Sequence, residues 1–336
     1  MRKIWLFVFI FGFVSAQSNK YAGEFLTFSG NAKNYALSGV DIWRGNRIYS
    51  SATNPAMLAF SEYESFQITG EHRFGGEVGF DSGQYATGNN KREQYAVGWA
   101  HVGISSIPDT RNALLDYGAD GKPNTNDAGE NNGIIDDGER IDPKLITYFS
   151  DHEMALLFSY GKRRGENSAI GATLKILHKR FAEFQAYGLG FDLGYFREIG
   201  NFAFSFVVRD PGTTYLFWDT EKTERFEPTI ESGIGWRWHS FKNFGVNVGI
   251  LCIMRSEGQS LSSHFVLFDK FGGELAAGIE LKIRRKISIR FGQNARNKFT
   301  CGGGLQLGRL HLDYAFALPR ERVLEYNHRL SVGFLL

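Results

Sequence analysis

The sequence has few of the features that mark disulfide-rich domains, helical membrane proteins or common enzymes. Two cysteines among 336 residues exclude a disulfide scaffold and a CxxC metal knuckle, and prolines number only seven. A mean hydropathy of −0.26 excludes a polytopic helical membrane protein, which needs several apolar runs of ~20 residues. No GxSxG, HExxH, phosphate-loop or dinucleotide motif is present, so we predict that the protein is not an enzyme.

The one continuous apolar run lies at the start of the chain. It extends from Ile4 to Val14, follows Arg2 and Lys3, and precedes the small residues Ser15 and Ala16. This pattern predicts a cleaved secretory signal peptide over residues 1–16. Its removal takes away two cations and leaves a formally neutral chain, which gives no argument for a nucleic-acid partner.

Glycine and phenylalanine are abundant instead, with 40 and 30 residues. From about residue 62 the pattern alternates with a period of two, as in 187–195, where aromatic and aliphatic residues alternate with glycines and Asp192. Successive side chains of a strand point to opposite faces. One face is apolar with aromatics near strand ends, and the other is glycine-rich yet charged. An exported chain of this kind predicts an all-β fold, an antiparallel transmembrane β-barrel of about 14 strands in the bacterial outer membrane, surrounded by lipid.

The mature chain divides into an N-terminal segment and a barrel of strands. Residues 17–61 do not alternate and read as short helical pieces with a turn at Asn54-Pro55. We expect this segment to be a lumenal hatch or plug seated by the Asn54-Pro55 kink, although an ordinary loop turn explains the kink as well. Residues 62–336 then form the barrel. The expected strands lie near 63–71, 74–81, 94–104, 152–162, 168–178, 185–197, 201–209, 229–239, 243–255, 273–283, 286–293, 298–307, 309–318 and 326–336.

Charged residues at inward positions favour a salt network in the lumen over a catalytic set. In the same register Cys252 and Cys301 face outward on strands that are not neighbours, which predicts two free thiols. The inward charges are Lys175, Asp192, Glu231, Arg237, Glu280, Lys282, Arg290, Asp313 and Arg329.

Several segments carry a family resemblance. The first of these segments is AGEFL at 22–26, followed by NAKNYALSG at 31–39 and SATNPAMLA at 51–59. TERFEPT at 223–229, LDYAF at 312–316 and NHRLS at 327–331 follow in order. Together they resemble the PorV/PorQ group of the FadL-type outer-membrane barrels, apart from one insertion. The glycines of the group's GMGGA segment are mostly replaced here by ALSGV at 36–40.

The resemblance implies one of two functions. PorV-type members serve the type IX secretion system, where they hold secreted cargo at the cell surface and present it to a sortase. FadL-type members pass hydrophobic solutes through a plugged barrel. We expect the first function, with Tyr215, Phe217 and Trp218 in a loop that faces a protein partner. The alternative is a transporter of hydrophobic small molecules, in which Asn54, Pro55, Phe25, Trp43 and Met57 face the ligand.

An acidic insertion at about 108–145 interrupts the strand pattern. Its stretch 116–142 carries eight acidic residues and two basic ones, and the parity of loop lengths places it outside the cell. Aligned on Gly133, the stretch fits most of a calcium loop, with Ala128 rather than aspartate at its first position. It predicts no required cofactor but a possible Ca²⁺ site, with a plain solvated loop as the alternative. The expected ligands are Asp127, Glu130, Asn132, the carbonyl of Ile134, Asp136 and Glu139.

Overall fold

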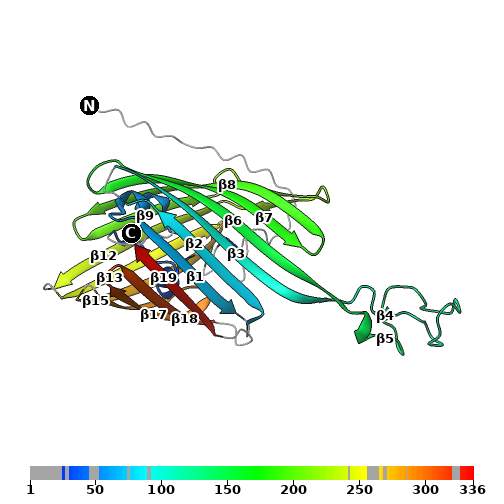
Figure 1. The fold of residues 1–336 in the computed structure, drawn as a ribbon. Helices are drawn as coiled ribbons and strands as arrows, with labels where there is room; N and C mark the ends of the chain where they lie inside the picture. Colours follow the sequence, from blue (N-terminus) through cyan, green and yellow to red (C-terminus); the bar gives the residue numbers. More distant parts are fainter. Residues whose placement is uncertain are drawn as a thin grey trace.

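The computed structural model of the chain is a β-barrel with a plug segment inside it (Figure 1). It describes residues 25–26, 30–44, 53–73, 76–88, 92–240, 243–255, 265–267, 271–284, 286–319 and 326–336. The predicted signal peptide, residues 1–16, lies outside the described residues. No helix within the described ranges has the length and apolarity needed to span a membrane.

Fourteen antiparallel strands of the described chain close into a barrel, because the first pairs with the last from Ser65 opposite Leu335 to His72 opposite His328. All fourteen overlap the predicted ranges, but β2 begins four residues and ends five residues later than the expected 74–81. In order around the barrel they are β1 (Ser65–Arg73), β2 (Val78–Ala86), β3 (Glu93–Asp109), β6 (Thr147–Arg163), β7 (Ser168–Phe181), β8 (Phe184–Ile199), β9 (Phe202–Arg209), β12 (Thr229–Ser240), β13 (Phe244–Arg255), β15 (Phe271–Ile283), β16 (Ile287–Gln293), β17 (Asn297–Leu307), β18 (Leu310–Pro319) and β19 (Asn327–Leu335).

The two faces of these strands differ as the alternation predicts. Along β1 the side chains of Gln67, Thr69 and Glu71 point inward and are buried, whereas Phe66 and Ile68 point outward and are exposed. Exposed aromatic and aliphatic side chains continue around the outer surface on the other strands. Such an apolar outer belt suits contact with acyl chains rather than water. Cys252 and Cys301 are free, as predicted.

The remaining described elements are short. A hairpin of β4 (Leu114–Leu115) and β5 (Arg140–Ile141) and the 3₁₀ helix η4 (Pro143–Leu145) lie in the acidic insertion, which projects beyond one end of the barrel, here called the loop end (Figure 1). Strands β10 (Thr214–Trp218) and β11 (Thr223–Phe226) extend the wall at the same end, and β14 (Phe265–Leu267) pairs with β15.

The strand ends differ from those expected. β3 and β6 each have 17 residues and continue past the predicted ends at 104 and 152 toward the insertion. Beyond the membrane both faces of a strand meet water, so no apolar alternation marks this extension. β10 and β11 fall in a segment expected to be a loop, because Pro211, Gly212 and Pro228 interrupt the pattern there.

The described part of residues 17–61 lies inside the barrel, and we call it the hatch. It contains helix α1 (Ala32–Ala36) and the 3₁₀ helix η2 (Pro55–Phe60). α1 packs against β16 to β19, while η2 packs against β3, β6, β7 and β8 on the other side of the lumen. Since opposite walls contact its two helices and Leu37, Val40 and Leu58 are fully buried, the hatch fills the lumen at this level.

Candidate functional site

Glycines of the barrel wall form the seat of the hatch. A β-carbon added at any of nine inward-facing glycines would lie only 2.0 to 2.9 Å from an atom of the hatch. Side chains other than hydrogen at these positions would collide with the hatch backbone or with its buried residues. The glycine-rich inner face is therefore the room that the hatch occupies. The nine are Gly161, Gly171, Gly194, Gly233, Gly235, Gly249, Gly278, Gly292 and Gly302.

A buried arginine fastens the start of the hatch. Arg329 on β19 is 1% exposed and pairs with Glu71 on β1, whose carboxylate also accepts a hydrogen bond of 2.7 Å from Arg73. The same guanidinium donates to the carbonyl of Gly30 and lies 4.1 Å from the ring centre of Tyr35. Removing such a charge from water is costly unless it is paired. The ion pair therefore ties the hatch to the wall where the barrel closes.

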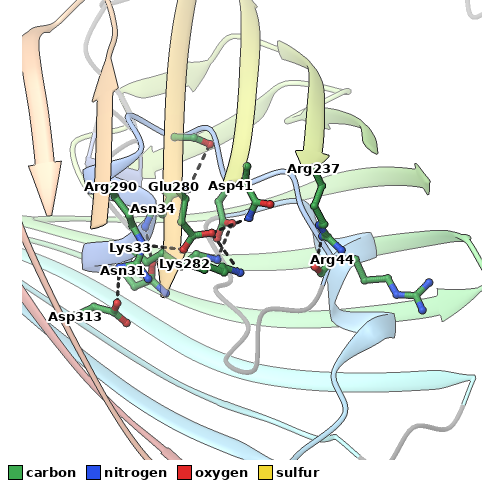
Figure 2. Close-up of polar contacts among 12 residues, drawn as sticks. Asn31, Lys33, Asn34, Asp41, Arg44, Arg237, Glu280, Lys282, Arg290 and Asp313 are labelled. Carbon is green, nitrogen blue, oxygen red and sulfur yellow. Dashed lines mark hydrogen bonds and ion pairs between the residues drawn. The ribbon is translucent and has the colours of Figure 1, made fainter. Parts of the chain in front are cut away.

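A second polar group lies on the adjacent wall (Figure 2). Within the hatch, Nζ of Lys33 lies 2.9 Å from the carboxylate of Asp41. Beside it on the wall, Glu280 accepts a hydrogen bond of 2.9 Å from Arg290, which also pairs with Asp313 at 2.5 Å. All nine inward charges expected from the sequence take part in ion pairs, so the predicted lumenal salt network is confirmed.

Asn54 and Pro55 seat the second helix of the hatch. The Asn54 side chain caps η2 by accepting a hydrogen bond of 2.9 Å from the amide of Ala56. Its amide group also donates to the wall, to the carbonyl of Tyr195 at 2.8 Å and the hydroxyl of Ser205 at 2.9 Å. Pro55 packs against two of the seat glycines. The expected kink is thus a helix start that is also hydrogen-bonded to the barrel.

The other predicted hatch residues are also buried inside the barrel. Trp43 is 1% exposed and fills the space above Gly235 and Gly249, and its indole Nε1 has no hydrogen-bond partner among the described residues. Met57 belongs to the same hydrophobic cluster as Trp43. Phe25 lies apart from this cluster, nearer to the loop end.

Phe25 packs on an apolar patch of the lumen wall. The patch is formed by inward-facing side chains of five strands at the loop end, and Leu26, Val102 and Trp218 pack against its edge. Among the described side chains it is the one hydrophobic cluster that contains Phe25 and residues of β10 and β11. We use the name apolar patch for Ala155, Leu157, Leu177, Ala186, Leu216 and Phe226.

The barrel wall is interrupted beside the apolar patch. β9 ends at Arg209, which pairs with Thr229, and β10 begins at Thr214, which pairs with Phe226. Residues 210–213 therefore stand opposite only residues 227–228, and the strand ladder is broken between them. Two of the four, Asp210 and Thr213, have φ values of 51° and 66°, a conformation that non-glycine residues seldom adopt.

Buried charges border this interruption. Nζ of Lys175 on β7 lies 2.7 Å from Asp192 and 2.6 Å from Asp210. Arg209 lies 2.6 Å from Glu231 and bridges to Asp192 at 3.2 Å. These ion pairs hold residues of four strands together around the break, and Lys175 pairs with the barrel residue Asp192 and with Asp210 at the break.

The three aromatic residues expected in a partner-binding loop lie on a strand instead. β10 pairs with β8, and Tyr215 and Phe217 point outward with their ring centres 6.1 Å apart. They are 43% and 61% exposed and continue the outer apolar belt. Trp218 points the other way, toward the apolar patch, with Nζ of Lys179 5.9 Å from its ring centre. The prediction of a common loop surface was wrong because strand alternation separates Trp218 from the other two.

The acidic insertion uses its carboxylates to hold its own backbone. Glu130 accepts hydrogen bonds from the amides of Thr125 and Asn126, and Glu139 accepts from Gly118 and Asp136. Within the described ranges, no three His, Cys, Asp or Glu side chains are placed to hold a metal ion. Calcium binding therefore stays a prediction.

The five side chains among the predicted calcium ligands all form hydrogen bonds within the insertion. Asp127 accepts from the amide of Asp120, while Asn132 donates to Asp136 and accepts from the amide of Ile134. One oxygen of Asp127, Oδ1, is buried without a hydrogen-bond partner among the described residues.

Comparison with solved structures identifies the fold. No protein-family model matches the chain, and no curated protein is significantly similar to it. The toluene transporter TodX of P. putida matches with a TM-score of 0.55 and 10% identity over 92% of this chain and 99% of that one. The toluene transporter TbuX of Ralstonia pickettii matches with a TM-score of 0.54 and 11% identity over 92% and 99%.

A third solved structure, the monoaromatic hydrocarbon channel CymD, gives a TM-score of 0.55 and 10% identity over 93% of this chain and 98% of that one. The predicted fold is confirmed: the chain is a closed 14-stranded barrel of the FadL-like outer-membrane type. Nothing in these likenesses points to the PorV/PorQ group. Identities near 10% show the fold alone, and these neighbours are transporters and channels rather than enzymes.

Proposed function

We propose that this protein is an outer-membrane channel for small hydrophobic molecules. The observation that carries the proposal is the apolar patch, which is covered by Phe25 and adjoins the interrupted wall. A hydrophobic solute that displaces Phe25 replaces one apolar contact with another, so it gains burial at little desolvation cost. The named activities of TodX, TbuX and CymD, all of the same fold, support the same solute class.

The arrangement of the lumen supports a route along one wall. The hatch closes the lumen where the glycine seat holds it, and the apolar patch lies on its loop-end side. The break at residues 210–213 adjoins Leu216 and Phe226 of the patch. A bound solute is therefore next to a break in the strand ladder, and the outward Tyr215 and Phe217 follow that break on β10.

The secretion function expected from the sequence is less well supported. It was implied by the resemblance to the PorV/PorQ group and favoured by long loops with exposed aromatics, and the three aromatics lie on two faces of β10 instead. Co-purification from outer membranes separates the two hypotheses. A sortase or secreted cargo bound to the protein would support the secretion component, and bound hydrocarbon or lipid without protein would support the channel.

Leu177 offers a direct test of the channel. We expect Leu177→Gln to lower the affinity for toluene about tenfold or more, because a buried amide without a partner costs roughly 1–3 kcal/mol. Leu177→Met keeps the apolar volume and serves as the control at the same position. Toluene binding to protein in micelles and uptake by cells that express each variant are the measurements. Equal affinity and uptake for Leu177→Gln and the unchanged protein would overturn the proposal.

A further inference from the structure

Two histidine side chains contact each other on the outer face of the barrel. His101 on β3 and His152 on β6 lie at outward positions of neighbouring strands, where Gly103 stands opposite His152. Their rings are stacked with centroids 5.4 Å apart and planes 16° apart. Nε2 of His101 lies 3.1 Å from Nδ1 of His152. Neither residue contributes to the hatch seat or the apolar patch.

A carboxylate on the next strand fixes the orientation of the first ring. Asp81 on β2 stands opposite His101, and its Oδ1 lies 2.8 Å from Nδ1 of His101. The indole of Trp99 donates to the other oxygen of Asp81 at 3.3 Å. Because the carboxylate accepts the proton of Nδ1, the lone pair of His101 lies on Nε2, the nitrogen that faces His152.

Glycines leave room for this arrangement. A β-carbon at Gly103 would lie 3.0 Å from Nδ1 of His152 and 3.2 Å from Cε1 of His101, so a side chain there would press on both rings. A β-carbon at Gly83 would lie 2.0 Å from the ring of Trp99. The backbone of β2 and β3 is therefore shaped around the histidine pair and the residues that orient it.

We propose that His101 and His152 together bind one divalent transition-metal ion of the Zn²⁺, Cu²⁺ or Ni²⁺ class. Two nitrogens that each lie ~2.0–2.1 Å from one ion are roughly 2.8–3.4 Å apart in square-planar or tetrahedral geometry. The observed separation of 3.1 Å falls in this range. The ion takes the place of the proton shared by the two nitrogens, and that proton moves to Nε2 of His152, so both ligating rings stay neutral.

Asp81 is a positioning residue in this site, since it holds the tautomer of His101 and raises the basicity of the ligating nitrogen. The protein supplies two ligands, because no third His, Cys, Asp or Glu of the described chain joins them. Water completes the coordination, since His152 stands at the predicted end of the membrane span, where β6 continues toward the insertion, and the side chains of His101 and Asp81 are 30% and 58% exposed.

Calorimetric titration of the full, tag-free barrel in detergent micelles with ZnCl₂ or NiCl₂ tests the proposal. We expect saturable binding of one ion by the unchanged protein and loss of that binding in His101→Asn and His152→Asn. Asp81→Asn should weaken it about 10–100-fold, because it removes the partner that orients a ligand. His178→Asn is the matched control, an outward histidine on the next strand whose ring stacks on Tyr187, and it should bind as the unchanged protein does.

A second control addresses the other outward histidines, since His72 and His328 face each other on β1 and β19. His72→Asn should leave the binding intact. Unheated gel mobility shows whether each variant is a folded barrel. Electron paramagnetic resonance of the unchanged protein with one equivalent of Cu²⁺ needs no variant, and coupling to two nitrogens is expected. No saturable binding, binding that survives both histidine changes, or loss of binding in His72→Asn would each overturn the assignment.

Discussion

On the wall formed by β15 to β19 and β1, charged side chains reach from the strands to the hatch, whereas the wall formed by β6 to β11 is apolar at the loop end and interrupted. Arg329 contacts Gly30 and Tyr35 on the first wall. Lys175 on the second pairs with Asp192 and Asp210 of the barrel. The difference teaches that the Arg329 anchor of the hatch and the apolar patch lie on different walls, so a solute that displaces Phe25 leaves the ion pair of Arg329 intact.

Arg329→Met gives the largest expected effect on this comparison. Removal of one partner leaves the buried Glu71 carboxylate with Arg73 alone, and the free energy of unfolding should fall by about 3 kcal/mol, the lower end for a broken buried pair. The variant should also conduct ions in planar bilayers, because the hatch loses its anchor. Urea unfolding in micelles and single-channel conductance are the measurements.

Lys175→Met is the matched control on the other wall. It also breaks a buried ion pair and should lower stability, yet it should leave the hatch closed, since Lys175 pairs with barrel residues. Equal conductance of the two variants would contradict the difference between the walls.

Gly235→Val should produce the next effect. A β-carbon at Gly235 would lie 2.5 Å from Nε1 of Trp43, so valine displaces the hatch. Overpacking of this kind costs about 1–3 kcal/mol, and hatch peptides should become sensitive to added protease. Gly70→Val on the outer face, where a β-carbon meets nothing within 4 Å, is the control. Protease resistance that is unchanged in Gly235→Val would show that the glycines are not a seat.

A smaller effect is expected at Asn54. Asn54→Ala removes both the cap of η2 and the hydrogen bonds to Tyr195 and Ser205, at a cost of about 1–2 kcal/mol. Asn54→Ser keeps an oxygen that can cap the helix but loses the donors to the wall, so it separates the two roles. Thermal unfolding should rank the alanine variant below the serine variant, and equal melting temperatures would leave the wall as the main contribution.

The smallest effect is expected in the acidic insertion. We propose that millimolar calcium raises the protease resistance of residues 116–142 only modestly, because Glu130 and Glu139 already accept hydrogen bonds from backbone amides. Limited proteolysis with calcium or with a chelator measures this, and Asp127→Asn with Glu130→Gln is the control variant. Calcium that changes neither the cleavage rate nor the melting temperature would rule out the site.

The barrel and the charged lumen could be predicted because both follow from a period of two. The alternation from Tyr187 to Tyr195 assigns apolar residues to the outer face. The same alternation assigns Arg329 and Glu280 to the inner face, without knowledge of which strands are neighbours. The glycine excess was also visible, but its cause was not, since a glycine such as Gly235 is explained only by Trp43, almost 200 residues away in the sequence.

Contacts between distant residues account for what sequence reasoning missed. Nothing in the order of residues brings Glu71 to Arg329 or His101 to His152, because closure and register of the sheet make these pairs. The period of two places His101 and His152 outward, and that was the only available signal. Because Pro211, Gly212 and Pro228 interrupt the alternation, β10 and β11 were not predicted. Tyr215 and Trp218 were therefore assigned to one loop surface.

Photoaffinity labelling with a diazirine-bearing aromatic hydrocarbon tests the central claim most directly. If the apolar patch binds hydrophobic solutes, the probe should label Leu216, Phe226 or Phe25 in a saturable way, and excess toluene should suppress that labelling. Labelling confined to outward residues such as Tyr215 and Phe217, with no competition by toluene, would mean that the probe partitions only into the detergent around the barrel and would contradict the account.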